Sequence, residues 1–115
     1  MKKLVQSFRF ALNGFIKNIP TERNLQIHLV TFLFVLALGF YFSISQFEWL
    51  TIFLISALVI SLELINSAIE KLCDFVQPDL HEKIKIIKDT AAAAVLVAAG
   101  IALVVGGIIF LPKIL

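Results

Sequence analysis

Three predominantly apolar stretches divide the chain, at residues 27–45, 47–65 and 90–111. Each approaches the roughly 20 residues that a helix needs to cross about 30 Å of hydrocarbon. Polar and charged residues are concentrated before the first stretch and between the second and the third. The pattern therefore predicts three transmembrane helices.

Residues 1–19 show a different pattern, in which apolar side chains recur at helical spacing. The apolar positions are Leu4, Phe8, Ala11, Leu12, Phe15, Ile16 and Ile19. Most of the lysine and arginine side chains lie off this stripe, which predicts an amphipathic helix on the inner membrane surface. We expect Pro20 to end the helix and Thr21 to cap the next one. A role as a simple anchor is the alternative for this segment.

The composition agrees with a membrane protein. The chain has 115 residues, of which 60% are hydrophobic and 16% charged, and its mean hydropathy is +0.99. Soluble domains contain about 45–50% apolar and about 25% charged residues. This difference argues against a cytosolic enzyme, a nucleic-acid binder or a secreted module. The single cysteine, Cys73, excludes an internal disulfide and a cysteine-rich metal site.

The basic residues predict the orientation in the membrane. Nine of the ten flank the first span's start or the segment between the second and third spans: Lys2, Lys3, Arg9, Lys17, Arg23, Lys71, Lys83, Lys85 and Lys88. Only Lys113 lies on the other side. Because loops rich in lysine and arginine stay in the cytoplasm, we expect the N-terminus and the loop at residues 75–88 to be cytoplasmic.

A polar stripe lies at the end of the second span, within the segment ELINSAIEKLCD. At about 100° per residue, its five polar side chains share one helix face about 100° wide. They are Glu63, Asn66, Ser67, Glu70 and Asp74. An ionised Glu at membrane depth is costly, so two acids on one face need a proton, a cation or a basic partner. A polar contact between helices and solvation near the headgroups are the non-catalytic alternatives.

The order of these residues suggests a mechanism. Glu63 lies nearest the membrane, and Glu70 lies two turns, or about 10 Å, further toward the cytoplasm. The deeper carboxylate can meet a lipid head, while the outer one can meet a soluble, charged cosubstrate. Carboxylates and phosphate oxygens are typical Mg²⁺ ligands, and Glu22 on the same side could share the ion. The chain has no glycine-rich phosphate loop, so any nucleotide site must be built from the helices.

Three motifs in order resemble the small prokaryotic membrane kinases that phosphorylate diacylglycerol and undecaprenol. They are ERNLQIH at residues 22–28, ELINSAIEKLCD at residues 63–74 and HEKIKIIKD at residues 81–89. The chain length, the surface helix and the three spans also match, so the resemblance covers essentially the whole chain. It implies an all-α integral membrane protein, a homotrimer in the bacterial inner membrane, with ATP and lipid sites between helices and subunits and facing the cytoplasm.

The resemblance also implies roles for individual residues. The catalytic base would fall on Glu63, and the ligands of Mg²⁺ on Glu22 and Glu70. Contacts to ATP would come from Glu22, Asn66, Glu70, Asp79, Leu80, His81, Lys88 and Asp89. Asp74 and Ser67 would support the site, and a basic contact from the N-terminal helix would fall on Lys3 or Arg9.

The resemblance leaves two lipid alcohols open as the substrate. The diacylglycerol branch tends to carry an acid where this chain has His28, so the resemblance favours undecaprenol. A small transporter with intramembrane acids, or a non-catalytic helical subunit, are the alternatives from other functional classes. No nucleic-acid partner is expected.

Overall fold

The computed structural model describes all 115 residues and contains four helices and no strands. The helices are α1 (Lys2–Asn18), α2 (Arg23–Tyr41), α3 (Gln46–Val76) and α4 (Glu82–Ile114). Helices α2, α3 and α4 are each long and apolar enough to cross a membrane. The predicted all-helical architecture with three candidate spans is therefore confirmed.

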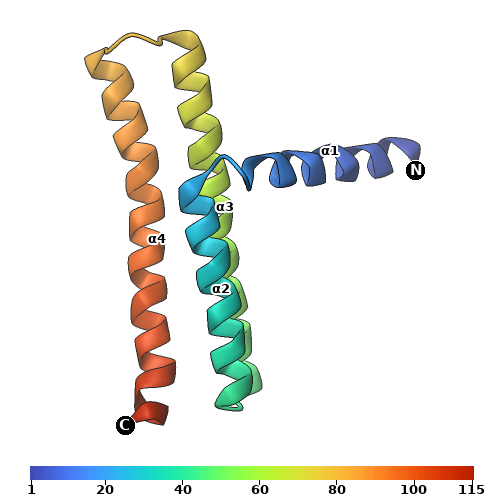
Figure 1. Cartoon of the computed structure of the whole chain (residues 1–115), viewed down its shortest axis with the longest axis vertical. Coiled ribbons are helices and arrows are strands. Elements are labelled where there is room, and N and C mark those ends of the chain that lie inside the picture. Colours follow the sequence, from blue (N-terminus) through green and yellow to red (C-terminus); the bar gives the residue numbers. More distant parts are fainter.

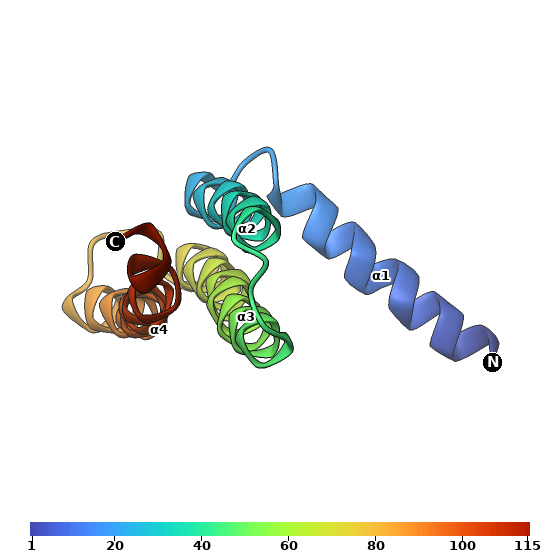
Figure 2. The same ribbon diagram turned by 90° about the horizontal axis from the view of Figure 1, so that it is seen from below.

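The three long helices lie side by side, whereas α1 projects sideways from the junction with α2 (Figure 1). Seen along the bundle, α2, α3 and α4 form a small group and α1 extends away from it (Figure 2). No residue of α1 is buried. The fold thus consists of a three-helix bundle and one helix that has little contact with it.

The turn between α2 and α3 begins earlier than the apolar pattern predicts. Helix α2 ends at Tyr41, so the last four residues of the expected span 27–45 lie in the turn. Ser45 then caps α3: its hydroxyl accepts a hydrogen bond from the Glu48 N–H at 3.1 Å, and the Glu48 carboxylate accepts one from the Ser45 N–H at 2.9 Å. This reciprocal capping box fixes the start of α3, and the chain must reverse before it.

The connection between α3 and α4 is shorter than expected. Helix α3 continues from the expected span 47–65 to Val76, and α4 begins at Glu82, before the expected span 90–111. The lysines assigned to a loop at residues 75–88 therefore lie on α4: Lys83, Lys85 and Lys88. The hydropathy pattern locates only the apolar part of a helix. The helix itself, defined by its backbone hydrogen bonds, continues into the polar sequence on either side.

The junction between α1 and α2 also differs in detail from the expectation. Helix α1 ends at Asn18, whose side-chain amide donates to the Gly14 carbonyl at 2.7 Å. Glu22, not Thr21, occupies the cap position of α2, and the Thr21 hydroxyl donates instead to the Asn18 carbonyl at 3.4 Å. The Asn18 carbonyl also accepts the Glu22 N–H at 2.9 Å. These bonds form a compact elbow between the two helices.

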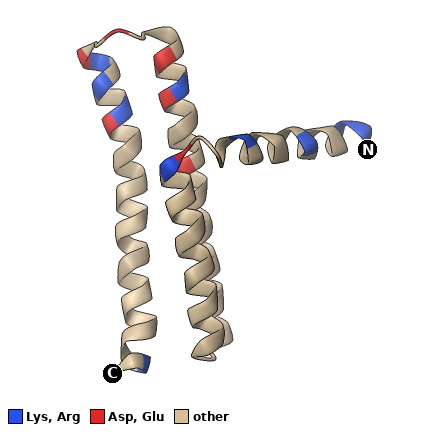
Figure 3. Ribbon diagram, viewed as in Figure 1, with Lys and Arg blue, Asp and Glu red and all other residues tan.

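Only 13 of the 115 residues are buried, so most apolar side chains face outward and need a hydrocarbon solvent. The main apolar cluster lies near the α2–α3 turn and contains Ile44, Ile52, Ile109 and Phe110. An ion pair of 2.8 Å between Lys113 and Glu48 closes this end of the bundle. Most other charged residues gather around the α3–α4 loop, at the elbow and along α1 (Figure 3). We call the end with the α3–α4 loop the polar end.

A close contact between α2 and α3, at Gly39 and Trp49, predicts a stability effect. A Cβ atom at Gly39 would lie 2.5 Å from a ring carbon of Trp49. We expect Gly39→Ala to destabilise the protein by about 1–3 kcal/mol, as overpacking typically does, and to lower Tm in detergent micelles. Gly100→Ala is the matched control, because nothing lies within 4 Å of its added Cβ. An unchanged Tm for Gly39→Ala would contradict this close packing.

Candidate active site

Helix α3 carries a polar face whose exposure increases toward the polar end. Glu63, Asn66 and Ser67 are buried, with exposed fractions of 2%, 4% and 2%. Glu70 is half-buried, and Asp74 is exposed. The periodicity of the sequence predicts this shared face, and the burial follows the predicted order from the deepest acid to the outermost.

Glu63 is the most deeply placed carboxylate of the polar face. It accepts no hydrogen bond from within the chain, and its nearest basic group is His28 on α2, with 3.7 Å between Nε2 and Oε2. A buried carboxylate without a close partner is costly. The sequence did not reveal this contact, although the hairpin of α2 and α3 puts the start of one helix beside the later part of the other.

Two further acids lie near Glu63. Glu22 lies in the elbow before α2, and Glu70 lies two turns along α3; the charges of both act on Glu63. The Glu70 carboxylate accepts a hydrogen bond from the Asn66 amide at 3.3 Å. Lys71 lies 3.5 Å from the Glu22 carboxylate and also donates to the Asn18 side chain. The fold therefore brings together the three acids that the sequence singles out.

The donor set suits a hard cation that also binds phosphate. No three His, Cys, Asp or Glu side chains of the chain are placed to hold a metal ion together. However, Mg²⁺ is commonly held by one or two carboxylates together with phosphate oxygens and waters. The buried Asn66 Oδ1 has no hydrogen-bond partner beside these carboxylates. By donor type, Glu22, Glu70 and this free oxygen therefore suit such an ion.

The first turns of α4 contribute two of the candidate nucleotide contacts. Lys88 pairs with Asp74 across the helix pair, and Lys85 pairs with Asp89 at 2.6 Å along α4. The pair with Asp74 places Lys88 beside the outer end of the polar face, and Asp89 is the next residue on α4. Asp74 is thus an ion-pair partner that holds α4 against α3.

The α3–α4 loop contributes no contact to the acids. Asp79 and Leu80 are exposed, and the Leu80 side chain is 99% exposed. His81 caps α4, where its Nδ1 accepts the Lys83 N–H at 3.1 Å. These three residues lie at the extreme polar end, away from Glu63, and only an elongated ligand could contact both regions.

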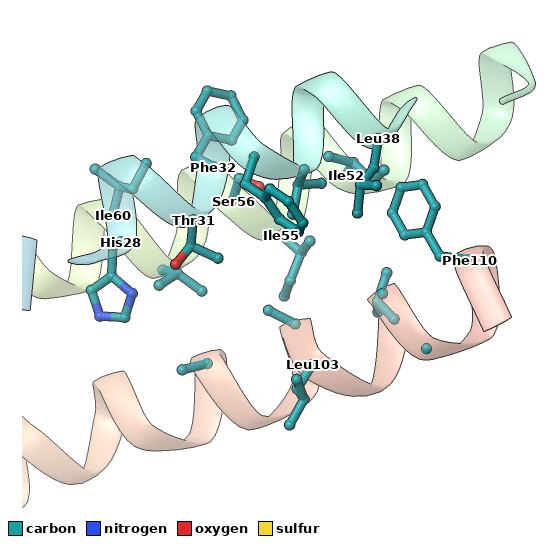
Figure 4. A pocket seen from close by; sticks show the side chains of 18 of the residues that line it. His28, Thr31, Phe32, Leu38, Ile52, Ile55, Ser56, Ile60, Leu103 and Phe110 are labelled. Atoms are coloured by element: carbon teal, nitrogen blue, oxygen red, sulfur yellow. The ribbon is translucent and has the colours of Figure 1, made fainter. Parts of the chain in front are cut away.

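An apolar groove of about 720 Å³ runs between α2, α3 and α4. Fifteen of its 20 lining residues are hydrophobic. His28 lies at one end, next to Ile60, and Phe110 lies at the other (Figure 4). Glu63 is one helical turn beyond Ile60 on α3. The groove is a tertiary feature that no single segment of the sequence encodes, and it ends beside the buried carboxylate.

The chain is similar to known bacterial proteins over almost its whole length. Residues 9–110 match the family described as prokaryotic diacylglycerol kinase. An undecaprenol kinase of Bacillus subtilis (strain 168) is 40% identical over 114 residues, which are 99% of this chain and 93% of that protein. A diacylglycerol kinase of Synechocystis sp. is 40% identical over 113 residues, which are 97% of this chain and 65% of that protein. With its three apolar helices and this near-complete match, the chain belongs to the prokaryotic diacylglycerol kinase family.

Proposed function

We propose that this protein is a lipid kinase that transfers the terminal phosphate of ATP, bound with Mg²⁺, to the hydroxyl of a membrane lipid alcohol. The observation that carries the proposal is the position of Glu63. It is a buried carboxylate at the end of an apolar groove and at the start of a polar face that leads to solvent. A membrane-embedded hydroxyl and a soluble nucleotide can meet only at such a boundary.

The lipid chain would occupy the groove, with its hydroxyl near Glu63. The Glu63 carboxylate would accept the hydroxyl proton as the lipid oxygen attacks the terminal phosphorus. A new bond then forms from that oxygen to phosphorus, and the bond from phosphorus to the bridging oxygen breaks, releasing ADP. Phosphoryl transfer depends mainly on positioning and charge neutralisation, so a few polar groups can suffice.

The nucleotide would lie along the outer part of the polar face. Mg²⁺ would supply neutralisation of the phosphate charge, held by Glu22 and Glu70. Asn66, Lys88 and Asp89 would contact the phosphates, and Asp79, Leu80 and His81 would contact more distant parts of the nucleotide. Asp74 would act through its ion pair with Lys88, and the buried hydroxyl of Ser67, which lacks a partner, would support the same face.

The assembly and the orientation are part of the same proposal. The nine basic residues near the polar end and along α1 favour a cytoplasmic polar end in the bacterial inner membrane. Helix α1, with no buried side chain, suits a position on the membrane surface. Family resemblance favours a homotrimer, in which neighbouring subunits would cover the open side of the polar face.

Undecaprenol is the favoured lipid alcohol. The undecaprenol kinase relative matches this chain over 93% of its own length, whereas the diacylglycerol kinase relative is matched over 65%. The identity is 40% in both cases and does not separate them. His28 beside Glu63, at a position where the diacylglycerol branch tends to carry an acid, supports the same choice.

The proposed activity predicts a direct transfer of phosphate to lipid. Purified protein in mixed micelles should transfer label from the terminal phosphate of ATP to undecaprenol, and less efficiently to diacylglycerol, when Mg²⁺ is present. The comparison is kcat/KM for the two lipids at equal mole fraction. Equal values, or a preference for diacylglycerol, would refute the choice of undecaprenol, and no transfer to either lipid would refute the kinase.

Removing the proposed base should separate turnover from nucleotide binding. Glu63→Gln keeps the shape of the side chain but cannot accept the proton, so turnover should fall by at least about 100-fold, the lower range for general-base catalysis. ATP affinity measured without lipid should persist. Glu82→Gln, which removes an exposed carboxylate at the start of α4, is the matched control. Near-normal turnover in Glu63→Gln would remove Glu63 as the base.

Removing either proposed metal ligand should change the dependence on Mg²⁺. Loss of even an outer partner of a metal ligand costs about 10–100-fold in metal affinity. We therefore expect Glu22→Gln and Glu70→Gln each to raise the half-saturating Mg²⁺ concentration by at least about tenfold. The oligomer, measured by size-exclusion chromatography with light scattering, should remain intact. Normal activity of both variants at limiting Mg²⁺ would show that these acids do not hold the ion.

A further inference from the structure

Lys71 lies on α3 next to Glu70, yet its side chain leaves the polar face and reaches the elbow between α1 and α2. Its amino group lies 3.5 Å from the Glu22 carboxylate and donates a hydrogen bond to the Asn18 side-chain oxygen. No role follows for it from the mechanism above. It thus links the end of α1 to an acid of the candidate active site.

Beyond the elbow, helix α1 has little contact with the bundle. It has no buried residue, and the bond from Lys71 to Asn18 is the only hydrogen bond that joins it to α2, α3 or α4. The Asn18 amide is itself fixed, because its nitrogen donates to the Gly14 carbonyl at 2.7 Å, leaving the oxygen toward Lys71. Lys71, together with the elbow, therefore holds the direction in which α1 leaves the bundle.

The hydrogen bonds of the elbow link the position of Asn18 to that of Glu22. The Asn18 carbonyl accepts the backbone N–H of Glu22 at 2.9 Å, and the Gln26 side chain of α2 donates to the Ile19 carbonyl at 2.7 Å. Asn18 and Glu22 thus form one short hydrogen-bonded unit. A single amino group that contacts both residues holds the unit against α3. On α3, the neighbouring Glu70 carboxylate accepts a hydrogen bond from the Asn66 amide.

The charges favour the same arrangement. Glu22 and Glu70 are both acidic, and the Lys71 amino group beside Glu22 offsets part of the negative charge there when no other ion is present. The Glu22 side chain is 20% exposed and that of Lys71 is 58% exposed. The pair therefore lies at the water boundary, where it can exchange partners without a buried charge being left alone.

We propose that Lys71 is a positioning residue that fastens the surface helix and Glu22 to α3, so that Glu22 faces Glu70 before Mg²⁺ and ATP arrive. This inference rests on the proposed function for its catalytic consequence, although the fastening itself does not. Lys71 touches neither the lipid hydroxyl nor the transferred phosphate in this scheme. It acts through the placement of Glu22 and α1.

The first measurement reports on the placement of α1 without any substrate. Spin labels on Gln6→Cys in α1 and Leu103→Cys in α4, in a Cys73→Ala background, give the distribution of distances between the two helices in lipid nanodiscs. Dilution with unlabelled protein restricts the signal to one chain. We expect Lys71→Met to broaden this distribution and Lys71→Arg to restore it. Asn18→Ala, which keeps the pair with Glu22, should also broaden it.

The second measurement reports on Glu22. Lys71→Met should raise the half-saturating Mg²⁺ concentration for lipid phosphorylation by about two- to fivefold, the range expected for one partly exposed ion pair. Maximal turnover at saturating Mg²⁺ should fall by a smaller factor, and Lys71→Arg should recover the Mg²⁺ dependence. Lys83→Met removes an exposed lysine of the polar end that has no acidic partner, and is the matched control for charge.

The outcomes separate this inference from the proposed function. If the wild-type chain phosphorylates no lipid, the proposed function fails, while the spin-label distances still test the fastening. An unchanged distance distribution in Lys71→Met would overturn the inference. A lower half-saturating Mg²⁺ concentration in that variant would also overturn it, because Lys71 would then only compete with the ion. Equal effects in Lys83→Met would also overturn the inference, because the loss of any positive charge at the polar end would then explain the result.

Discussion

The hydrocarbon interior of the membrane is the constraint on which this structure depends. A backbone in hydrocarbon must satisfy its own hydrogen bonds, which only helices and closed barrels do. Of the 95 backbone hydrogen bonds in this chain, 83 lie within its helices. The same solvent excludes charge from the middle of the bundle, so almost all charged groups stand at the helix ends and on α1 (Figure 3). Any chemistry that needs charge must therefore take place at a boundary.

Helix α3 crosses that boundary without a break, and its burial gradient follows. One continuous helix carries Glu63 at 2% exposure, a half-buried Glu70 and an exposed Asp74 along the same face. A rigid helix keeps these groups at fixed spacing while their surroundings change from apolar to aqueous. The neighbouring helices then add one group each at a suitable height: His28 from α2 beside the deep acid, and Lys88 from α4 beside the outer one.

Hydropathy and helical periodicity predicted the helices and the polar face, because both depend on neighbours along the chain. They did not predict where the helices end, since Ser45 and Glu48 cap α3 through side-chain hydrogen bonds and α4 begins within a polar segment. Hydropathy and periodicity also did not predict the contacts between helices. The approach of His28 to Glu63 depends on the register of α2 against α3, and the reach of Lys71 to Glu22 depends on the elbow. The apolar groove needs all three long helices in place.

Because α3 is continuous, it also fixes the distance between Glu63 and Glu70 along the membrane normal. Seven residues separate Glu63 from Glu70, which corresponds to about 10 Å of rise. If the hydroxyl is activated at the first and the phosphates are neutralised near the second, an acceptor must present its hydroxyl within a narrow depth of the hydrocarbon edge. A lipid alcohol whose oxygen directly follows its chain meets that requirement. A hydroxyl carried far from the lipid chain on a sugar or phosphate head would lie beyond that depth, so the proposed kinase would select its acceptors by the depth of the hydroxyl.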